Sequence, residues 1–235
     1  MSEKERMEEK MASNRKTARI TGILFIIATV ASIASTPFLG SIDSSNYLVD
    51  VSANGNQVMV GALFALIAAF ASASIAISLY PILRKYSEGL ALGAVGFRLI
   101  EGALYIVGVV GLLSLLALSQ EFVKTGSPNS SSFQPLGASL LAGYRWAYYV
   151  AGPVAFCIGA MMYYYIFYQT KLVPRWLSSW GLVGAALLIA AAVLVMFHLI
   201  GYLSTFQAVL VLPIAVQEMV LALWLIVKGF NPSEV

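Results

Sequence analysis

Residues 58–83 read VMVGALFALIAAFASASIAISLYPIL, a stretch without a charged side chain that is followed directly by Arg84 and Lys85. An α-helix rises 1.5 Å per residue, so about 20 apolar residues cross a hydrocarbon core about 30 Å thick. The stretch is long enough to do so, and basic residues such as those that follow it mark membrane boundaries. It therefore predicts a transmembrane helix.

The same pattern, an apolar run bounded by charged or loop-forming residues, occurs six times. We predict spans at residues 17–39, 58–83, 90–118, 136–168, 177–200 and 204–227. Hydrophobic residues make up 60% of the chain and charged residues 11%, which leaves little material for a soluble domain. The predicted fold is all-α, a polytopic membrane protein with a single bundle of six transmembrane helices. The fourth span is too long for an upright helix, and we expect an interfacial start over residues 138–144.

Lysine and arginine are distributed unevenly between the two ends of these spans. One set of ends holds Lys4, Arg6, Lys10, Arg15, Lys16, Arg19, Arg84, Lys85, Lys171, Arg175 and Lys228. The opposite loops offer only Lys124, with Asp43, Asp50 and Glu121 nearby. Because cytoplasmic loops retain positive charge, both termini of this multi-pass protein are predicted to be cytoplasmic.

This orientation gives a simple domain plan. We expect a mobile cytoplasmic tail at residues 1–16, the six-helix domain at 17–229 and a cytoplasmic C-terminal tail at 230–235. The net charge is +3, and the basic residues behind it are dispersed along the membrane boundaries instead of covering one face. The expected partner is therefore the lipid bilayer and not nucleic acid.

A few polar residues fall where lipid should surround the chain. Arg98 and Glu101 lie in the third span, and Gln217 and Glu218 lie in the sixth. An ionised side chain at the bilayer centre costs a few kcal/mol, so each needs a partner or a wet cavity. Arg98 and Glu101 share a helix face, on which Tyr105 continues. Counting from the basic ends places both acids about 15 to 18 Å deep, so the two helices are predicted to meet in one Arg/Glu cluster.

Two readings of this cluster remain open. Two carboxylates around one guanidinium would satisfy each other and act only as a clamp between helices. Alternatively, the cluster binds a ligand, an ion or a proton. Pro213 frees the carbonyl of Val209 and could open a polar niche beside Glu218, which favours the second reading.

A second and weaker group is predicted near the opposite face. Arg145, His198 and Gln207 come close to that boundary in three different spans, and Tyr148 lies near them. The alternative is that His198 is an interfacial, hydrogen-bonded imidazole and that Arg145 extends to the lipid headgroups.

Two small-residue features concern packing. Gly89 and Gly93 form a GxxxG spacing, which predicts a close helix contact either inside the bundle or in a homo-oligomer. The single cysteine, Cys157, excludes an intrachain disulfide and a CxxC site.

Enzyme chemistry finds little support in the sequence. One histidine cannot supply a multi-histidine metal site, and HExxH, GxSxG and GxxxxGK[ST] motifs are all missing. We therefore predict no catalytic residues, no metal and no cofactor. Carboxylate acid/base chemistry on a lipid at Glu101 and Glu218 is the least favoured of the functional readings.

Several motifs together carry a resemblance. They are ARITGI at 18–23, LYPIL at 79–83, GFRLIEG at 96–102, VPRWL at 173–177 and EMVLALWLIVKG at 218–229. This set resembles the prokaryotic integral membrane family catalogued as domain of unknown function 4386, over roughly residues 15–231. The resemblance implies the six-helix fold, a prokaryotic source and therefore a location in the inner (cytoplasmic) membrane, and it draws attention to Arg98, Glu101 and Glu218. It implies no substrate.

Three functions follow from these observations. We favour binding or transport of a small polar or amphipathic ligand, which requires a water-accessible cavity reaching Glu101 or Glu218. A structural or regulatory membrane subunit would instead have a sealed cluster and an exposed small-residue face near Gly89 and Gly93. A lipid-modifying enzyme would need both carboxylates at an opening toward the bilayer.

Overall fold

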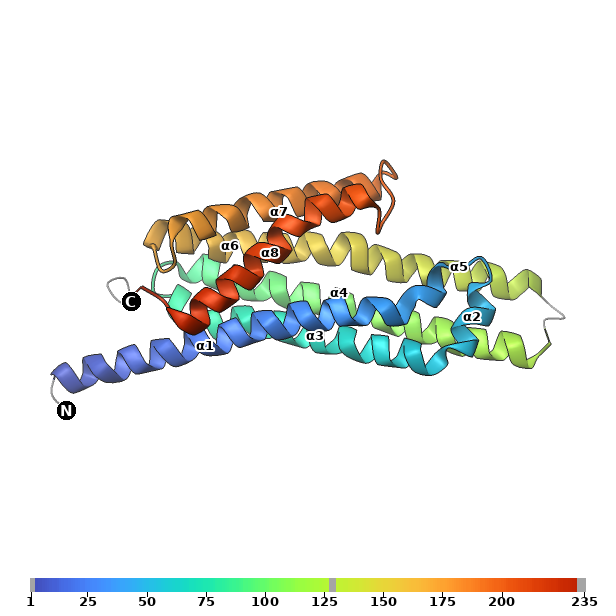
Figure 1. Ribbon diagram of the computed structural model, residues 1–235, viewed down its shortest axis with the longest axis horizontal. Coiled ribbons are helices and arrows are strands. Elements are labelled where there is room, and N and C mark those ends of the chain that lie inside the picture. The colour runs from blue at the N-terminus through green and yellow to red at the C-terminus, as the bar shows by residue number, and fades with distance from the viewer. Residues whose placement is uncertain (1–2, 127–129, 232–235) are drawn as a thin grey trace.

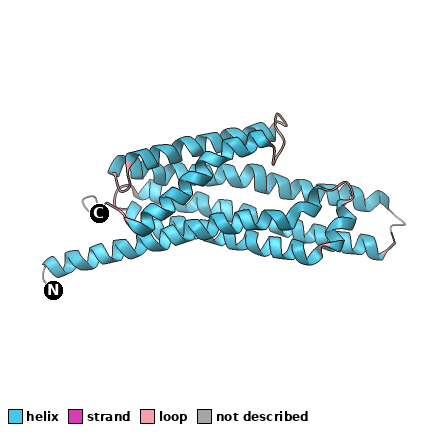
Figure 2. Cartoon of the chain, viewed as in Figure 1, coloured by secondary structure: helices cyan, strands magenta, loops and turns pink. Residues whose placement is uncertain are grey.

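The computed structural model describes residues 3–126 and 130–231, and these residues are helical apart from short connections (Figure 2). The elements in chain order are α1 (Glu3–Ser35), the 3₁₀-helix η1 (Thr36–Asp43), α2 (Tyr47–Ala53), α3 (Gly55–Leu83), α4 (Glu88–Lys124), α5 (Ser130–Trp146), the π-helical turn η2 (Ala147–Ala151), α6 (Gly152–Thr170), α7 (Arg175–Met196) and α8 (Thr205–Val227).

Six helical segments are long and apolar enough to cross a membrane, as predicted. They are Met11–Gly40, Gly55–Leu83, Glu88–Lys124, Ser132–Thr170, Arg175–Met196 and Thr205–Val227. Within the described residues there is no strand, so backbone polar groups are satisfied inside helices, as a hydrocarbon environment requires. The chain is therefore an all-α, multi-pass membrane protein.

The fourth span has a different construction from the others. α5, η2 and α6 run on from one another, and the π-helical turn lies in the middle of the apolar run (Figure 1). α4 has 37 residues and is also longer than a bilayer requires. α5 packs along the second half of α4, and α2 packs on the same helix, so a helical extension forms beyond the bundle at the end opposite the termini.

The spans form a closed ring. α1 packs on α3, α3 on α4, α4 on α6, α6 on α7 and α7 on α8, and α8 returns to pack on α1. In Figure 1, α8 crosses the front of the bundle and meets α1 near the end that carries both termini. Chain neighbours are thus spatial neighbours, and only the α8–α1 contact closes the ring.

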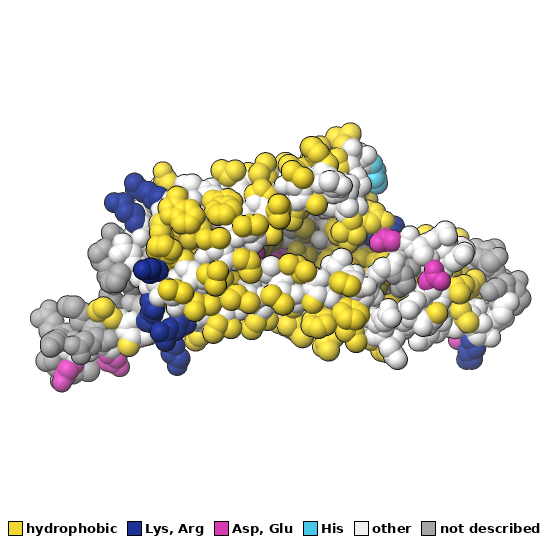
Figure 3. Space-filling model, viewed as in Figure 1, with side chains coloured by type: hydrophobic (Ala, Val, Ile, Leu, Met, Phe, Trp, Pro, Cys, Tyr) yellow, Lys and Arg dark blue, Asp and Glu magenta, His cyan; other side chains and the backbone are white. Residues whose placement is uncertain are grey.

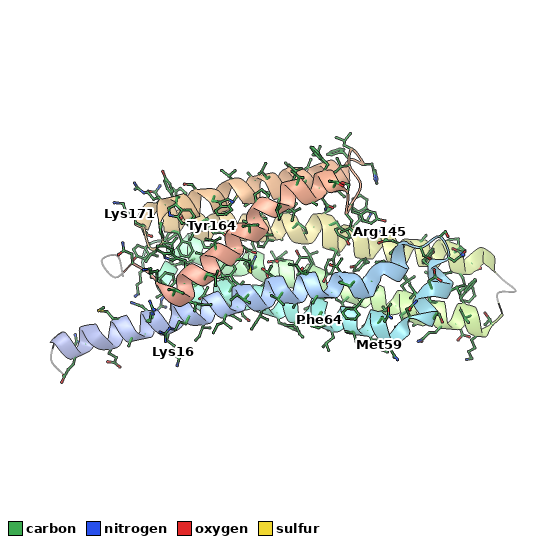
Figure 4. All side chains as sticks on the ribbon, in the orientation of Figure 1. Lys16, Met59, Phe64, Arg145, Tyr164 and Lys171 are labelled. Atoms are coloured by element: carbon green, nitrogen blue, oxygen red, sulfur yellow. The ribbon has the colours of Figure 1, made fainter. Side chains whose placement is uncertain are left out.

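Charge differs between the two ends of the ring. Most lysine and arginine side chains gather at the end that holds the N- and C-termini, and an apolar band covers the middle (Figure 3). Lys16 and Lys171 lie at this basic end, whereas Arg145 lies toward the opposite end (Figure 4). We call these the basic end and the distal end.

We expected a tail at residues 1–16. From Glu3 onward, this segment forms the first part of α1. Its Glu, Lys, Arg and Met residues are good helix formers, which accounts for a helix without an apolar face to bury. Of the two predicted tails, residues 1–2 and 232–235 lie outside the described part of the chain.

Ring closure depends on a small residue in α1. A Cβ atom at Gly22 would lie 2.7 Å from the carbonyl oxygen of Ala222 and 2.7 Å from Cγ1 of Ile226, both in α8. Any side chain at this position must therefore push α8 away from α1. In contrast, a Cβ atom at Gly96 in α4 meets open space.

We expect Gly22→Ala to lower the melting temperature of the purified protein in detergent, because the new methyl group separates α1 from α8. Gly96→Ala is the matched control and should raise stability by about 0.5–1 kcal/mol, since alanine is the better helix former and nothing obstructs it. Equal effects of the two substitutions on thermal unfolding would contradict a tight contact at Gly22.

Candidate functional site

An ion pair lies buried inside the ring. Arg98 Nη1 is 3.2 Å from Glu101 Oε2, and the side chains are 1% and 3% exposed. The two residues are three positions apart on α4, so they project from one face of the helix, as predicted. The contact balances the two charges, but neither of these atoms is in hydrogen-bonding geometry with any partner. Arg98 Nη1 and Glu101 Oε2 are therefore buried without a hydrogen bond.

Neighbouring helices complete the surroundings of this pair. Ser72 in α3 donates its hydroxyl proton to Glu101 Oε1 at 2.8 Å, and its backbone carbonyl accepts from Arg98 Nε at 3.2 Å. On the α6 side, the Arg98 guanidinium carbon lies 4.6 Å from the ring centre of Phe156. The guanidinium is therefore held by a carboxylate, a carbonyl and an aromatic face, which fixes it firmly between three helices.

Glu218 in α8 does not take part in these hydrogen bonds or in the ion pair. Its Oε1 atom is buried without a hydrogen-bond partner. Among the described residues, no Lys, Arg or His nitrogen forms an ion pair within 4.0 Å of it. The structure thus brings Glu218 to the same region as Arg98 and Glu101 but does not join it to them directly.

A cavity of about 250 Å³ connects the three charged residues. All six spans contribute to its wall, with Thr29 and Ser32 from α1, Ser72 from α3, Tyr105 from α4, Phe156 from α6, Leu188 from α7 and Glu218 from α8 among the lining residues. Figure 3 shows the surface hollowed between α8 and α1, with acidic atoms at the floor of the hollow. The cavity therefore lies inside the ring and opens on the side of the bundle.

Two further cavities continue toward the distal end. One of about 510 Å³ shares Ser32, Tyr105 and Val211 with the first, and its wall includes four tyrosines, Tyr105, Tyr144, Tyr148 and Tyr149. The next, of about 690 Å³, shares Asp43 and Tyr149 with the second. Shared wall residues make the three cavities neighbours in a series that runs from Glu218 to the distal end.

The remaining residues predicted for the cluster divide between two faces of the bundle. Tyr105 lines the first two cavities. Gln217 points elsewhere, because its side chain accepts a hydrogen bond of 2.6 Å from the Tyr164 hydroxyl and donates one of 3.0 Å to the Leu177 carbonyl. Adjacent positions on a helix project about 100° apart, so Gln217 fastens α8 to α6 and α7 while Glu218 faces the cavity.

The weaker predicted group lies at the distal end but is only partly assembled. Arg145 and His198 line the outermost cavity, and His198 contacts Trp146 with ring centres 5.8 Å apart. Gln207 and Tyr148 line the middle cavity instead. The Gln207 side chain accepts a hydrogen bond from the Leu203 backbone N–H just before α8, and Ser204 caps the helix by accepting from the Gln207 backbone N–H at 3.2 Å.

Arg145 contacts two residues, Asp43 and Tyr202, that the sequence analysis did not predict as its partners. Its Nη2 atom is 2.7 Å from Asp43 Oδ1, and its guanidinium carbon lies 4.5 Å from the ring centre of Tyr202. The Tyr202 hydroxyl donates to the same Asp43 oxygen at 3.3 Å. Partial burial raises the pKa of Tyr202, which keeps the hydroxyl protonated as a donor. This contact joins η1, α5 and the loop between α7 and α8.

Several residues of the cavity wall had a sequence signal that could have been used. Thr29, Ser32 and Thr36 recur at spacings of three and four in a mostly apolar run, which places their hydroxyl groups on one helix face. Ser72 had no such signal, since serines are frequent in α3 and only the packing of α3 on α4 selects this one.

Other expected features can be placed as well. A Cβ atom at Gly93 would meet Met162 of α6 at 2.7 Å, whereas one at Gly89 meets open space, so the two glycines face different surroundings. Cys157 is buried and free. In the described part of the chain, no three His, Cys, Asp or Glu side chains gather as a metal ion would require.

The ring of six spans and its polar interior define a polytopic helical membrane protein. Comparison with family models assigns it more closely: the chain belongs to the family described as domain of unknown function DUF4386, whose model matches residues 20–229. No curated protein and no solved structure match the chain. The family description carries no activity, so function must be argued from the cavity.

We expect Arg98→Met to lower the free energy of unfolding by about 3–5 kcal/mol, because Glu101 would keep a buried charge without its partner. The double variant Arg98→Met/Glu101→Gln should regain most of this loss. Arg145→Met is the control at a partly exposed ion pair and should cost at most about 1 kcal/mol. Denaturation in detergent measures all three, and a double variant as unstable as Arg98→Met would contradict the pairing.

Proposed function

We propose that this protein binds a small amphipathic ligand in the central cavity, with a cationic or hydrogen-bond-donating group of the ligand on Glu218. The observation that carries the proposal is the buried Glu218 oxygen without a partner, beside a cavity of about 250 Å³. A buried acceptor left unsatisfied costs about 1–3 kcal/mol, and a donor from a ligand would remove that cost.

The charges around the cavity favour a cationic group. Arg98 is already held by Glu101, the Ser72 carbonyl and the Phe156 ring, so it offers little to an anion. With both acids ionised, two carboxylates face one guanidinium, a formal balance of −1. The tyrosines of the adjoining cavity add aromatic faces, which attract cations.

The shape of the cavity favours an amphipathic ligand. Its wall combines the polar residues with apolar ones such as Ile33, Leu188 and Val211, and it opens on the apolar side of the bundle between α1 and α8. A molecule dissolved in the bilayer could enter there, and the series of cavities offers a second route from the distal end.

Transport would require a further movement. At the basic end, α1 and α8 are in contact at Gly22, so passage to that side requires the two helices to separate. The basic residues at this end support the assignment of both termini to the cytoplasm and of the protein to the inner membrane. In that orientation the distal end, with the outermost cavity of the series, faces the outside of the cell.

The competing function is a structural or regulatory subunit in which the charged residues are only an interhelical clamp. It requires Glu218 to contribute to stability. We expect instead that Glu218→Gln leaves the melting temperature in detergent unchanged or raises it, since an unpaired carboxylate is replaced by a neutral amide. Gln217→Ala, at the neighbouring position, should lower it through the loss of two buried hydrogen bonds. A loss of stability in Glu218→Gln as large as in Arg98→Met would support the clamp.

The cavity itself can be tested with cysteine chemistry in a Cys157→Ala background. We expect Ser32→Cys to react with membrane-impermeant methanethiosulfonates added outside cells, and the trimethylammonium reagent to react faster than the sulfonate reagent. Adding Glu218→Gln should reduce this preference severalfold. Ala222→Cys, which is buried between α8 and α1, is the unreactive control. Absence of reaction at position 32, or equal rates for both reagents, would overturn the proposal.

A further inference from the structure

A fourth cavity, of about 490 Å³, lies at the basic end, apart from the series of three that begins at Glu218. It is formed by the loop between α6 and α7 together with the C-terminal end of α8. Its wall comprises Lys171, Leu172, Val173, Pro174, Arg175, Trp224, Lys228, Gly229, Phe230 and Asn231. Three of these residues are cationic and none is acidic.

The backbone around this cavity is well fixed. The Asn231 N–H donates to the Leu172 carbonyl at 2.9 Å, which joins the segment after α8 to the loop. Leu172, Val173 and Phe230 are buried, and Phe230 packs on Phe167 of α6. Arg15 Nη2 donates to the Val227 carbonyl at 2.6 Å and so holds the end of α8 to α1. The site is thus a defined concave surface.

Within the described part of the chain, no acidic side chain pairs with the cations of this wall. The ion pairs among the described residues involve Glu101, Glu121 and Asp43, and none includes Lys171, Arg175 or Lys228. Arg175 uses Nε to donate to the Tyr168 carbonyl at 3.3 Å and lies over the Tyr168 ring, which leaves the rest of its guanidinium available. α7 begins at Arg175, so the positive end of its helix dipole adds to the field.

We propose that this basic-end cavity binds the phosphate-bearing headgroup of an anionic phospholipid. Three cations without an acidic partner among residues 3–126 and 130–231 surround one concavity, which suits a phosphodiester, and lysine and arginine are the side chains that bind phosphate. The adjoining surface suits acyl chains: Leu223 and Val227 on α8 and Trp176 on α7 are exposed. A free phosphate has no use for that apolar surface, whereas a lipid covers both parts.

The test uses the purified full-length protein in detergent, titrated with phosphatidylglycerol, phosphatidylcholine or inorganic phosphate while the melting temperature is recorded. We expect phosphatidylglycerol to raise the melting temperature well above the effect of the other two. The triple variant Lys171→Gln/Arg175→Gln/Lys228→Gln should bind it on the order of 100-fold more weakly, since each cation contributes roughly a factor of five.

The matched control removes three positive charges at the same end but outside the cavity, Lys16→Gln/Arg19→Gln/Arg84→Gln. It should keep nearly the full response to phosphatidylglycerol. Equal losses in the two triple variants would overturn the site, because general surface charge would then explain the binding. An equal response to inorganic phosphate would also overturn it, in favour of a soluble anion. Single substitutions at 171 and 228 give the same comparison should the triple variant not fold.

Discussion

The ion pair between Arg98 and Glu101 is the interaction around which the interior of this protein is organised. A charge in the middle of a membrane bundle is tolerated only with a partner and with hydrogen bonds for the remaining polar atoms. These come from α3 through Ser72 and from α6 through the face of Phe156. A Cβ atom at Gly159 would lie 3.2 Å from Arg98 Cγ, a tight contact, so the small residue helps α6 to approach the arginine closely. The pair therefore sets how closely α3, α4 and α6 pack.

α8 is attached to this core by contacts that do not involve Glu218. Gln217 bonds to Tyr164 and to the Leu177 carbonyl, and Ala222 and Ile226 lie against Gly22. These contacts hold α8 against α6, α7 and α1 without neutralising the acid beside the cavity. The Oε1 atom of this carboxylate is buried without a hydrogen-bond partner, and this observation is the physical basis of the proposal that a ligand binds there. The same contacts also explain why the ring is closed at the basic end and hollow further along.

Much of this arrangement could be predicted from the sequence, because hydropathy and charge act locally. The six spans, the common face of Arg98 and Glu101 and the gathering of basic residues at one end all follow from helix periodicity and from the cost of charge in lipid. The direction of a side chain toward a particular neighbour was not predictable. Gln217 and Glu218 are adjacent and both polar, yet only helix rotation decides which faces the cavity. The Gln207 side chain likewise turns to the backbone N–H of Leu203 just before α8, and Asp43 pairs with Arg145 only because η1 meets α5.

The distal end is held together differently from the basic end, and the difference bears on how a ligand could enter. There the link between η1, α5 and the loop after α7 is the contact of Arg145 with Asp43 and Tyr202, whose ion-paired side chains are 29% and 38% exposed. Exposed ion pairs contribute only about 0–1 kcal/mol, far less than buried helix packing. At the basic end, α1 and α8 instead meet closely at Gly22, which faces the backbone carbonyl of Ala222 and the side chain of Ile226. Widening the bundle at the distal end therefore costs less than separating α1 from α8, so a ligand that reaches Glu218 should enter and leave by the distal end or from the bilayer.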